Sequence, residues 1–351
     1  MTGTILHWSA DGVDALPLRR ERLVRALAGE VAQVLAAEAA EARAPVRAAR
    51  VTRADLPALA GRAWPARLKK LAAAMAGHDL ICTWGSGALD AVLAHTLFAD
   101  VYKLAPLVHH EGSGGNAGGL RRRIALGRTA AIIVPDHAAE RLALGDWQQP
   151  RGRVRMIPTG IDTAPLAAAR AKRDGVPGIV KRRDERWLGT VADGGDLAPL
   201  LSAMAGLPQA WQLVIAGQGV DRDAVLAEAA VTGNDHRVHF AGSAHHARVL
   251  PLFDLFAATG SLPEVTLLEA MAAGLPILVP RGAARGLLAS ENGPVLPADA
   301  HGLTKAVLQL AGDDAGRGRI GTANRALARA EHDEAKMIER YRALYRSLMG
   351  K

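Results

Sequence analysis

The sequence predicts an α/β protein with two domains, each built on a doubly wound parallel β-sheet. Short apolar runs alternate with helical segments along the chain, which is the order of elements that such sheets require. The length of 351 residues suits two domains. Hydrophobic residues make up 49% of the chain and aromatic residues 4%, so Ala, Leu and Val must fill most of both cores.

The first half of the chain carries four candidate strands with helices between them. Thr4–Trp8 begins the series, and Leu16–Leu35 follows as one long helix because its apolar residues recur every three to four positions. The three later strands are Asp79–Thr83, Leu104–Val108 and Ala130–Val134. This alternation predicts a parallel sheet.

The second half contains another set of apolar runs, each short enough to be a buried strand. These runs are Trp187–Val191, Trp211–Gly219, Arg237–Gly242 and Phe253–Phe256. Ser261–Pro280 follows and combines a loop, a helix and a strand, with a tight turn at Gly274–Pro276. The strand after this turn is apolar throughout, as expected for a parallel strand that is covered on both faces.

Cysteine usage and hydropathy indicate the compartment. The lone Cys82 cannot form an internal disulfide, and no Cys/His cluster has metal-ligand spacing, so we expect a reducing compartment and no metal or other cofactor. No run approaches the ~18 apolar residues that span a bilayer, and Met1–Trp8 lacks the regions of a signal peptide. The sequence therefore predicts a cytoplasmic protein.

The helix within Ser261–Pro280 begins with groups that suit a phosphorylated sugar. Thr266 and the backbone N–H groups around it are expected to face a phosphate, because the first N–H groups of a helix have no acceptor within it. Glu269, expected in the first turn, offers a carboxylate to a ribose or sugar hydroxyl. An ordinary helix-strand unit with a solvated glutamate would have the same pattern, so the neighbouring segments must decide.

Four segments supply that context: Arg155–Asp162, Trp211–Gly219, Arg237–Gly242 and Ser261–Pro280. In this order they resemble glycosyltransferase family four, over nearly the whole chain. The resemblance implies the GT-B fold, in which two Rossmann-like domains face a central cleft. It also implies a retaining enzyme that moves a sugar from a nucleotide diphosphate donor to a lipid-linked or polysaccharide acceptor in bacterial envelope glycan synthesis.

The domain organisation follows from composition and from this resemblance. Residues 1–162 would form the acceptor-side domain, and residues 187–330 the domain that binds the nucleotide sugar. Residues 163–186 are the expected linker, because this stretch is rich in Ala, Lys and Arg and keeps no apolar period. Residues 331–351 form a helix with an apolar stripe that includes Met337, Tyr341 and Tyr345, which the resemblance implies docks back on the first domain.

In the first domain, a glycine-rich loop follows the apolar run that ends in two histidines and a glutamate. Ligands of open α/β sheets bind at this carboxyl edge. The resemblance places His109 beside the reacting sugar, and His110 is the second catalytic candidate; a histidine held by loop backbone is the alternative. The expected acceptor and donor loop residues are Gly12, Gly85, Glu111 and Gly112.

In the second domain, the resemblance implies a nucleotide site. The backbone near Val238–Gly242 would hold the base, Glu269 the ribose, and the Val265–Leu267 amides the diphosphate. The expected nucleotide-binding residues are Gly217, Gly219, Phe240, Gly242, Val265, Thr266, Leu267 and Glu269.

Two features of the family are missing. The Arg/Lys pair that follows the first strand of the second domain is replaced by Asp193–Asp196, and Ser261 stands where the family has a glutamate, eight positions before Glu269. A second hypothesis is therefore a catalytically impaired GT-B protein that binds nucleotide or a partner protein as a scaffold. If the protein is an enzyme, Arg281 or Arg285 would have to neutralise the diphosphate.

The net charge of +8 suggests an anionic partner. In the first domain Arg67, Lys69 and Lys70 alternate with Trp64 and Leu68, which suits an anionic membrane surface and predicts peripheral binding to the inner face of the cytoplasmic membrane. A solvated basic face is the alternative. No helix-turn-helix, aromatic platform or zinc module accompanies the charge, which argues against nucleic acid.

Overall fold

The computed structural model describes residues 3–9, 16–37, 50–112, 119–166, 179–191, 196–217, 219–242, 246–260, 262–284, 286–297 and 300–350. The chain divides into two compact units, Met1–Gly160 with Ala335–Lys351, and Ile161–Glu334. The first division lies two residues before the expected position 162, and the described parts of segment 163–186, expected as a linker, belong to the second unit.

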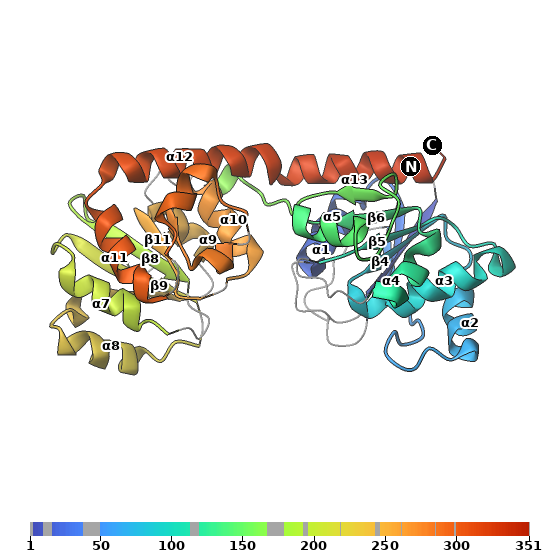
Figure 1. The fold of residues 1–351 in the computed structure, drawn as a ribbon, viewed down its shortest axis with the longest axis horizontal. Helices are drawn as coiled ribbons and strands as arrows, with labels where there is room; N and C mark the ends of the chain where they lie inside the picture. Colours follow the sequence, from blue (N-terminus) through green and yellow to red (C-terminus); the bar gives the residue numbers. More distant parts are fainter. Residues whose placement is uncertain are drawn as a thin grey trace. The chain divides into compact units, whose positions relative to one another are not determined.

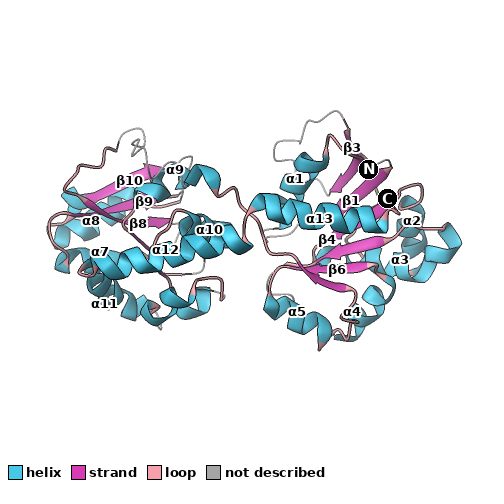
Figure 2. Ribbon diagram, turned by 90° about the horizontal axis from the view of Figure 1, so that it is seen from above, coloured by secondary structure: helices cyan, strands magenta, loops and turns pink. Residues whose placement is uncertain are grey.

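The first domain is a parallel sheet with helices packed against it (Figures 1 and 2). Over the described residues its strand order is β3-β2-β1-β4-β5-β6-β7. The strands are β1 (Thr4–Ser9), β2 (Ala32–Ala37), β3 (Val51–Arg53), β4 (Leu80–Trp84), β5 (Leu107–His110), β6 (Ala131–Val134) and β7 (Val154–Met156). The helices are α1 (Leu16–Leu27), α2 (Pro65–Ala74), α3 (Leu89–Tyr102), α4 (Gly119–Ala125), α5 (His137–Leu144) and α13 (Glu334–Leu348).

Successive residues of the buried strands supply two separate cores, because side chains alternate between the faces of a sheet. Leu6 and Ile81 belong to the core that also contains residues of α2, α3 and α5. Ile5 and Leu80 belong to the core that contains residues of α1 and α13. Both faces of the sheet are therefore covered.

Helix α13 completes the second of these cores. Met337, Tyr341 and Tyr345 are at most 2% exposed, and they lie on one helix face because they are spaced four residues apart. Two hydrogen bonds of 2.7 and 2.9 Å join the Arg342 guanidinium to the carboxylate of Glu30, in the turn after α1. The last helix of the chain is thus part of the first domain's hydrophobic interior.

The second domain repeats the architecture with a smaller sheet (Figure 1). In the part of the chain that is described, its strand order is β10-β9-β8-β11-β12. The strands are β8 (Arg186–Val191), β9 (Trp211–Ala216), β10 (Val238–Gly242), β11 (Leu255–Ala257) and β12 (Ile277–Leu278). The helices are α7 (Ala198–Gly206), α8 (Arg222–Val231), α9 (His246–Val249), α10 (Glu264–Ala272), α11 (Ala300–Ala311) and α12 (Asp314–Glu331).

Both sheets reverse their winding direction at one place. In the first domain this switch lies between β1 and β4, and in the second it lies between β8 and β11. All the strand pairings at these positions are parallel. The crevice at the carboxyl ends of the strands on either side of such a switch is where ligands of this architecture bind. The predicted fold class of two doubly wound parallel sheets is confirmed.

The predicted helix Leu16–Leu35 is wrong in its second half. Helix α1 ends at Leu27, a turn covers residues 28–30, and the chain then enters strand β2. Strand β2 pairs with β1 on one side and with β3 on the other. Alanine favours helices in isolation, but here tertiary pairing with two strands overrides that preference.

Gly189 in β8 allows an aromatic ring to lie against the strand. A Cβ atom at this position would overlap the carbon atoms of the Phe253 ring. Phe253 is 1% exposed, so it has no room to move aside. The core of the second domain that contains Phe253 therefore requires glycine at position 189.

Candidate functional site

His109 lies inside the first domain at the carboxyl end of β5. Its ring is fully buried, with Nδ1 2.8 Å from Thr83 Oγ1 and Nε2 3.2 Å from Glu111 Oε1. Arg122 of α4 donates to the same Glu111 oxygen at 2.8 Å. The Arg122 guanidinium in turn lies over the ring of Trp147, 4.7 Å from its centroid. The described structure therefore joins His109 and Glu111 in a buried polar chain.

His110 points to the opposite face of the sheet. Its ring stacks on Trp84 with centroids 3.7 Å apart, and Nδ1 lies 2.9 Å from the Thr83 carbonyl oxygen. Nε2 lies 3.2 Å from the Tyr345 hydroxyl of α13. Both ring nitrogens are thus engaged, Nδ1 with β4 and Nε2 with α13. The catalytic roles of both histidines stay predictions.

The other predicted residues of this domain lie at the same sheet edge. Gly85 directly follows β4, has φ +78°, and donates its N–H to the His110 carbonyl oxygen at 2.8 Å. Gly112 is buried next to Glu111. Gly12 lies outside the described residues. The structure thus brings Gly85, Glu111 and the two histidines together.

A buried column of rings was missed by sequence reasoning. His7, Trp84, His110, Tyr341 and Tyr345 follow one another with centroid separations between 3.7 and 5.9 Å. The strand register places Trp84 beside His110. The column joins β1, β4 and β5 to α13.

This column makes the first domain sensitive to acid. Burial lowers the pKa of His7 to about 3, and burial also holds the pKa of His110 well below its usual value. The ordinary histidine pKa of about 6.5 applies to the unfolded chain, which therefore binds more protons below that pH. Stability should fall as the pH drops from about 6.5 toward about 3, by up to about 1.4 kcal/mol per pH unit for each histidine.

We expect urea unfolding of the first domain to show this slope between pH 7 and pH 5.5. His7→Gln and His110→Gln should each flatten it, whatever their effect on stability at pH 7. His137→Gln is the matched control, because that side chain is 74% exposed. A slope that is the same in all four proteins would contradict the assignment.

The glycines predicted for the nucleotide site lie at the carboxyl edge of the second sheet. Gly217, Gly219 and Gly242 have φ values of +120°, +79° and +68°, which other residues rarely adopt. The Gly217 N–H donates to the Gly242 carbonyl oxygen at 3.3 Å. The ends of β9 and β10 are therefore joined by two of the predicted residues.

Phe240 of β10 is covered by a cation that sequence reasoning missed. The Arg222 guanidinium carbon lies 4.9 Å from the centroid of the Phe240 ring. Arg222 is exposed and opens α8, directly after the turn that contains Gly217 and Gly219. Its place just after that glycine pair was the available signal. The arrangement puts a positive charge at the carboxyl edge of β9 and β10.

The start of α10 differs from the prediction. Helix α10 begins at Glu264, so Glu269 lies in its second turn. The Thr266 and Leu267 N–H groups both donate to the Pro263 carbonyl oxygen, at 3.0 and 3.4 Å, and are not the open donors that were expected. The Val265 N–H, by contrast, has no acceptor within the described part of the chain.

The carboxylate that opens α10 is Glu264 rather than Glu269. Glu264 is 7% exposed, and Glu269 is half-buried. The two side chains are five residues apart and emerge from different turns. Either can offer a carboxylate to a sugar hydroxyl, and the structure places both near the switch between β8 and β11.

Of the residues expected to determine the charge at the diphosphate, Asp196 and Arg281 lie in the described part of the chain. Asp196 Oδ1 accepts the N–H of Ala198, the first residue of α7, at 2.9 Å. The Arg281 guanidinium donates to the carbonyl oxygens of Gly293 and Leu296 at 3.4 and 3.3 Å, which ties it to the segment after β12. Arg285, Ser261 and residues 193–195 lie outside the described residues. Among the described residues no three or more His, Cys, Asp or Glu side chains are arranged to hold a metal ion.

Part of the second domain matches a known family, and the fold of the chain matches solved structures. Residues 188–313 match the family described as Glycosyl transferases group 1. This match spans β8 to α11 and thus the carboxyl edge described above. The two Rossmann-like domains match solved GT-B glycosyltransferases. No curated protein sequence matches the chain.

Three solved structures illustrate the likeness. HepE from Anabaena, solved with UDP, is 18% identical, with a TM-score of 0.69 over 98% of this chain and 100% of HepE. A glycosyltransferase from Rickettsia africae is 12% identical, with a TM-score of 0.70 over 99% and 98%. WaaG, a glycosyltransferase involved in lipopolysaccharide biosynthesis, is 15% identical, with a TM-score of 0.57 over 100% of both chains. At these identities the likeness shows the fold.

Proposed function

We propose that this protein transfers a sugar from a nucleotide diphosphate donor to a lipid-linked or polysaccharide acceptor of the bacterial envelope, with retention of configuration. The observation that carries the proposal is the match of residues 188–313 to group 1 glycosyl transferases, which covers the carboxyl edge of the second sheet. HepE, which shares the fold, has been solved with UDP-glucose. WaaG, another structure of this fold, is involved in lipopolysaccharide biosynthesis.

The nucleotide would lie at the switch between β8 and β11. The start of α10 supplies the Val265 N–H and the positive end of a helix to the diphosphate. Glu269 accepts the ribose hydroxyls in this proposal. Arg222, the first residue of α8, supplies a positive charge at an edge where Asp196 supplies none.

Replacing Glu269 by alanine is expected to weaken UDP binding by about 1.5–3 kcal/mol, the range for a hydrogen bond to a charged group. Isothermal titration calorimetry with UDP measures the change directly. Glu228→Ala is the matched control, because Glu228 is an exposed glutamate on α8. Equal affinity of the Glu269 variant and wild type, with the fold intact, would remove the ribose assignment.

The second candidate is a scaffold that binds nucleotide without turnover. The Asp196 carboxylate, which accepts the Ala198 N–H in the place where the family has a cation, favours it. Release of UDP from UDP-glucose, followed over hours in the absence of acceptor, separates the two functions. Slow hydrolysis supports the enzyme. Tight UDP binding with no release from several nucleotide sugars supports the scaffold.

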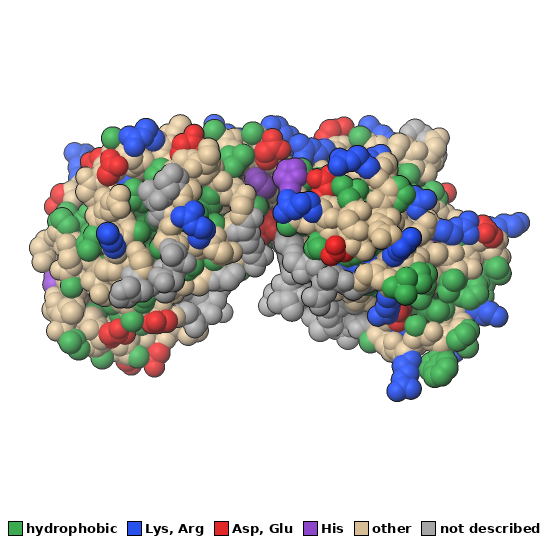
Figure 3. All heavy atoms as spheres, viewed as in Figure 1, with side chains coloured by type: hydrophobic (Ala, Val, Ile, Leu, Met, Phe, Trp, Pro, Cys, Tyr) green, Lys and Arg blue, Asp and Glu red, His purple; other side chains and the backbone are tan. Residues whose placement is uncertain are grey.

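The first domain also carries a surface that suits a membrane. Its exposed large apolar side chains lie on α3, on α4 and at the residue before α2, and Figure 3 shows such side chains close to Lys and Arg on this domain. They are Trp64, Leu97, Val101, Leu120 and Ile124, between 50% and 72% exposed. Helix α3 packs on both α2 and α4, so the three helices are neighbours. Within the described residues, no helix is long and apolar enough to cross a membrane.

One predicted membrane residue has another role. Arg67 donates to Asp90 at 2.7 Å and to the Ala58 carbonyl oxygen at 3.1 Å, and its side chain is 20% exposed. Lys69 and Lys70 are exposed on the same helix. We therefore propose peripheral binding to the inner face of the cytoplasmic membrane through Trp64, Lys69 and Lys70, with Arg67 holding α2 to α3.

The variant with Trp64→Ala, Lys69→Gln and Lys70→Gln is expected to bind anionic vesicles at least about 10-fold more weakly, since each cation near such a surface is worth about 1 kcal/mol. Cosedimentation with phosphatidylglycerol vesicles measures this, and added salt should weaken the wild type. The control carries Arg183→Gln and Lys305→Gln, two exposed cations of the second domain. Equal binding of wild type to neutral vesicles would argue against the surface.

A further inference from the structure

The second domain has a hollow at the amino edge of its sheet, away from the carboxyl edge that the proposed function uses. Its volume is about 420 Å³. Arg186 lines it from the first residue of β8, and Asp254 lines it from the position just before β11. Helix α12 supplies much of the remaining wall. This volume falls within the range of small-molecule sites.

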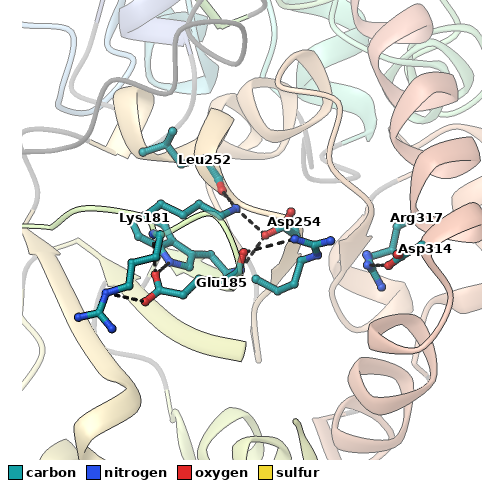
Figure 4. Close-up of polar contacts among 9 residues, drawn as sticks. Lys181, Glu185, Leu252, Asp254, Asp314 and Arg317 are labelled. Atoms are coloured by element: carbon teal, nitrogen blue, oxygen red, sulfur yellow. Dashed lines mark hydrogen bonds and ion pairs between the residues drawn. The ribbon is translucent and has the colours of Figure 1, made fainter. Parts of the chain in front are cut away.

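The charges around this hollow favour an anion. Asp254 is bound by Lys181 Nζ at 2.5 Å and by the Trp187 N–H at 2.7 Å, and Asp314 pairs with Arg317. Figure 4 shows the two ion pairs on separate elements, with Asp314 and Arg317 on α12. Each lining carboxylate therefore already has a cation. Two more arginines, Arg186 and Arg325, line the hollow, so positive charge is in excess there.

Arg325 is held in a fixed position at this wall. Its Nη2 donates to the Ala273 carbonyl oxygen at 2.8 Å, at the end of α10. Arg186 is half-buried, and its Nη1 lies 3.5 Å from the Glu185 carbonyl oxygen, the limit of a hydrogen bond. A positioned guanidinium binds phosphate oxygens with little loss of side-chain freedom.

Gly318 leaves the helix side of the hollow open. Of the glycines in α12, Gly316 would collide with Asp313 and Gly321 with the Gly274 carbonyl if either carried a Cβ atom, so packing explains both. A Cβ atom at Gly318 would meet nothing within 4 Å, and Gly318 lines the hollow. Glycine inside a helix costs about 1 kcal/mol relative to alanine. No packing contact accounts for that cost at position 318.

We propose that this hollow binds a small phosphorylated molecule, with Arg186 and Arg325 bound to its phosphate oxygens and Gly318 leaving room for its body. The site is separate from the carboxyl edge, where the nucleotide sugar would bind. Both sites belong to the second domain, so the protein can be tested for two independent binding events.

Calorimetric titration of the full chain with pyrophosphate, in a phosphate-free buffer that contains saturating UDP to occupy the proposed nucleotide site, tests the proposal. Wild type should bind saturably, and Arg186→Gln should weaken binding about 10-fold or more, as expected when a charged hydrogen bond is lost. Arg182→Gln is the matched control, because that side chain is 81% exposed and does not line the hollow. It should bind as wild type does.

Gly318→Leu is the second test and does not depend on charge. It should fill the hollow and abolish pyrophosphate binding while the melting temperature stays equal or rises, because leucine favours a helix more than glycine does. Binding that survives both Gly318→Leu and Arg186→Gln would place the anion elsewhere and overturn the proposal. The absence of saturable binding to wild type would overturn it as well.

Discussion

A chain that ends at Glu334 is expected to lose the folded first domain and to keep the second. The missing segment carries Met337, Tyr341 and Tyr345, each at most 2% exposed. Removing three such side chains should cost about 8 kcal/mol or more, which is comparable to the whole stability of a typical domain. Calorimetry should show one unfolding transition in place of two, and limited proteolysis should degrade the first domain alone.

Point variants separate packing from polar contacts in this effect. Tyr345→Ala should destabilise the first domain by about 3–5 kcal/mol, and Tyr345→Phe by about 1 kcal/mol, because the second removes only the hydroxyl beside His110. Arg340→Ala on the exposed side of α13 should change little. Full retention of both transitions in the shortened chain would show that α13 is not needed for the first core.

Replacement of Gly189 by valine is expected to unfold the second domain. The new side chain would occupy the space of the Phe253 ring, which is 1% exposed and lies in the main core of that domain. Overpacking of a tight core costs about 3 kcal/mol or more when the neighbour cannot move. Urea unfolding followed by circular dichroism should show the second transition shifted to much lower urea or lost.

Gly318→Ala gives the matched comparison for this variant. Both changes add side-chain atoms to a glycine of the same domain, but the site at 318 is open and lies in a helix. Stability should therefore rise by about 0.5–1 kcal/mol. Similar losses in the two variants would mean that any larger residue is tolerated poorly in this domain, whatever its contacts.

The fold class could be predicted because the central strands are continuous apolar runs. Ala131–Val134 and Trp187–Val191 are buried on both faces of their sheets. Such strands are rich in apolar residues, and this makes them recognisable in the sequence. Strand β2 could not be predicted in this way, because Ala32–Ala37 favours a helix and becomes a strand through pairing with β1 and β3. Its identity depends on partners that are distant in the sequence.

The candidate site was predicted less well than the fold. His109 was correctly predicted at the carboxyl edge of the first sheet, and Gly217 and Gly242 at the carboxyl edge of the second, because the carboxyl ends of parallel strands follow from strand order. The face of the sheet to which each side chain points could not be predicted from the sequence. Adjacent residues of β5 point to opposite faces, and their burial depends on Thr83 and Trp84 of the neighbouring strand.

The position of Glu269 within its helix could not be predicted from the sequence either. Glu269 was expected in the first turn, but the helix already starts at Glu264, directly after Pro263. Element boundaries depend on capping and local turns, and here Ser261, two residues before that proline, lies outside the described residues. Arg222 was missed because its significance depends on Phe240, a neighbour from another strand.

The burial of Cys82 gives the first domain a chemical reporter of its own opening. This cysteine is the single one in the chain, and burial raises the pKa of its thiol to about 12. Alkylating reagents attack the thiolate, so the folded molecule is inert toward them at neutral pH. Each molecule that opens beneath α13 can take up one label, and mass spectrometry of a timed reaction would count those openings without any engineered probe.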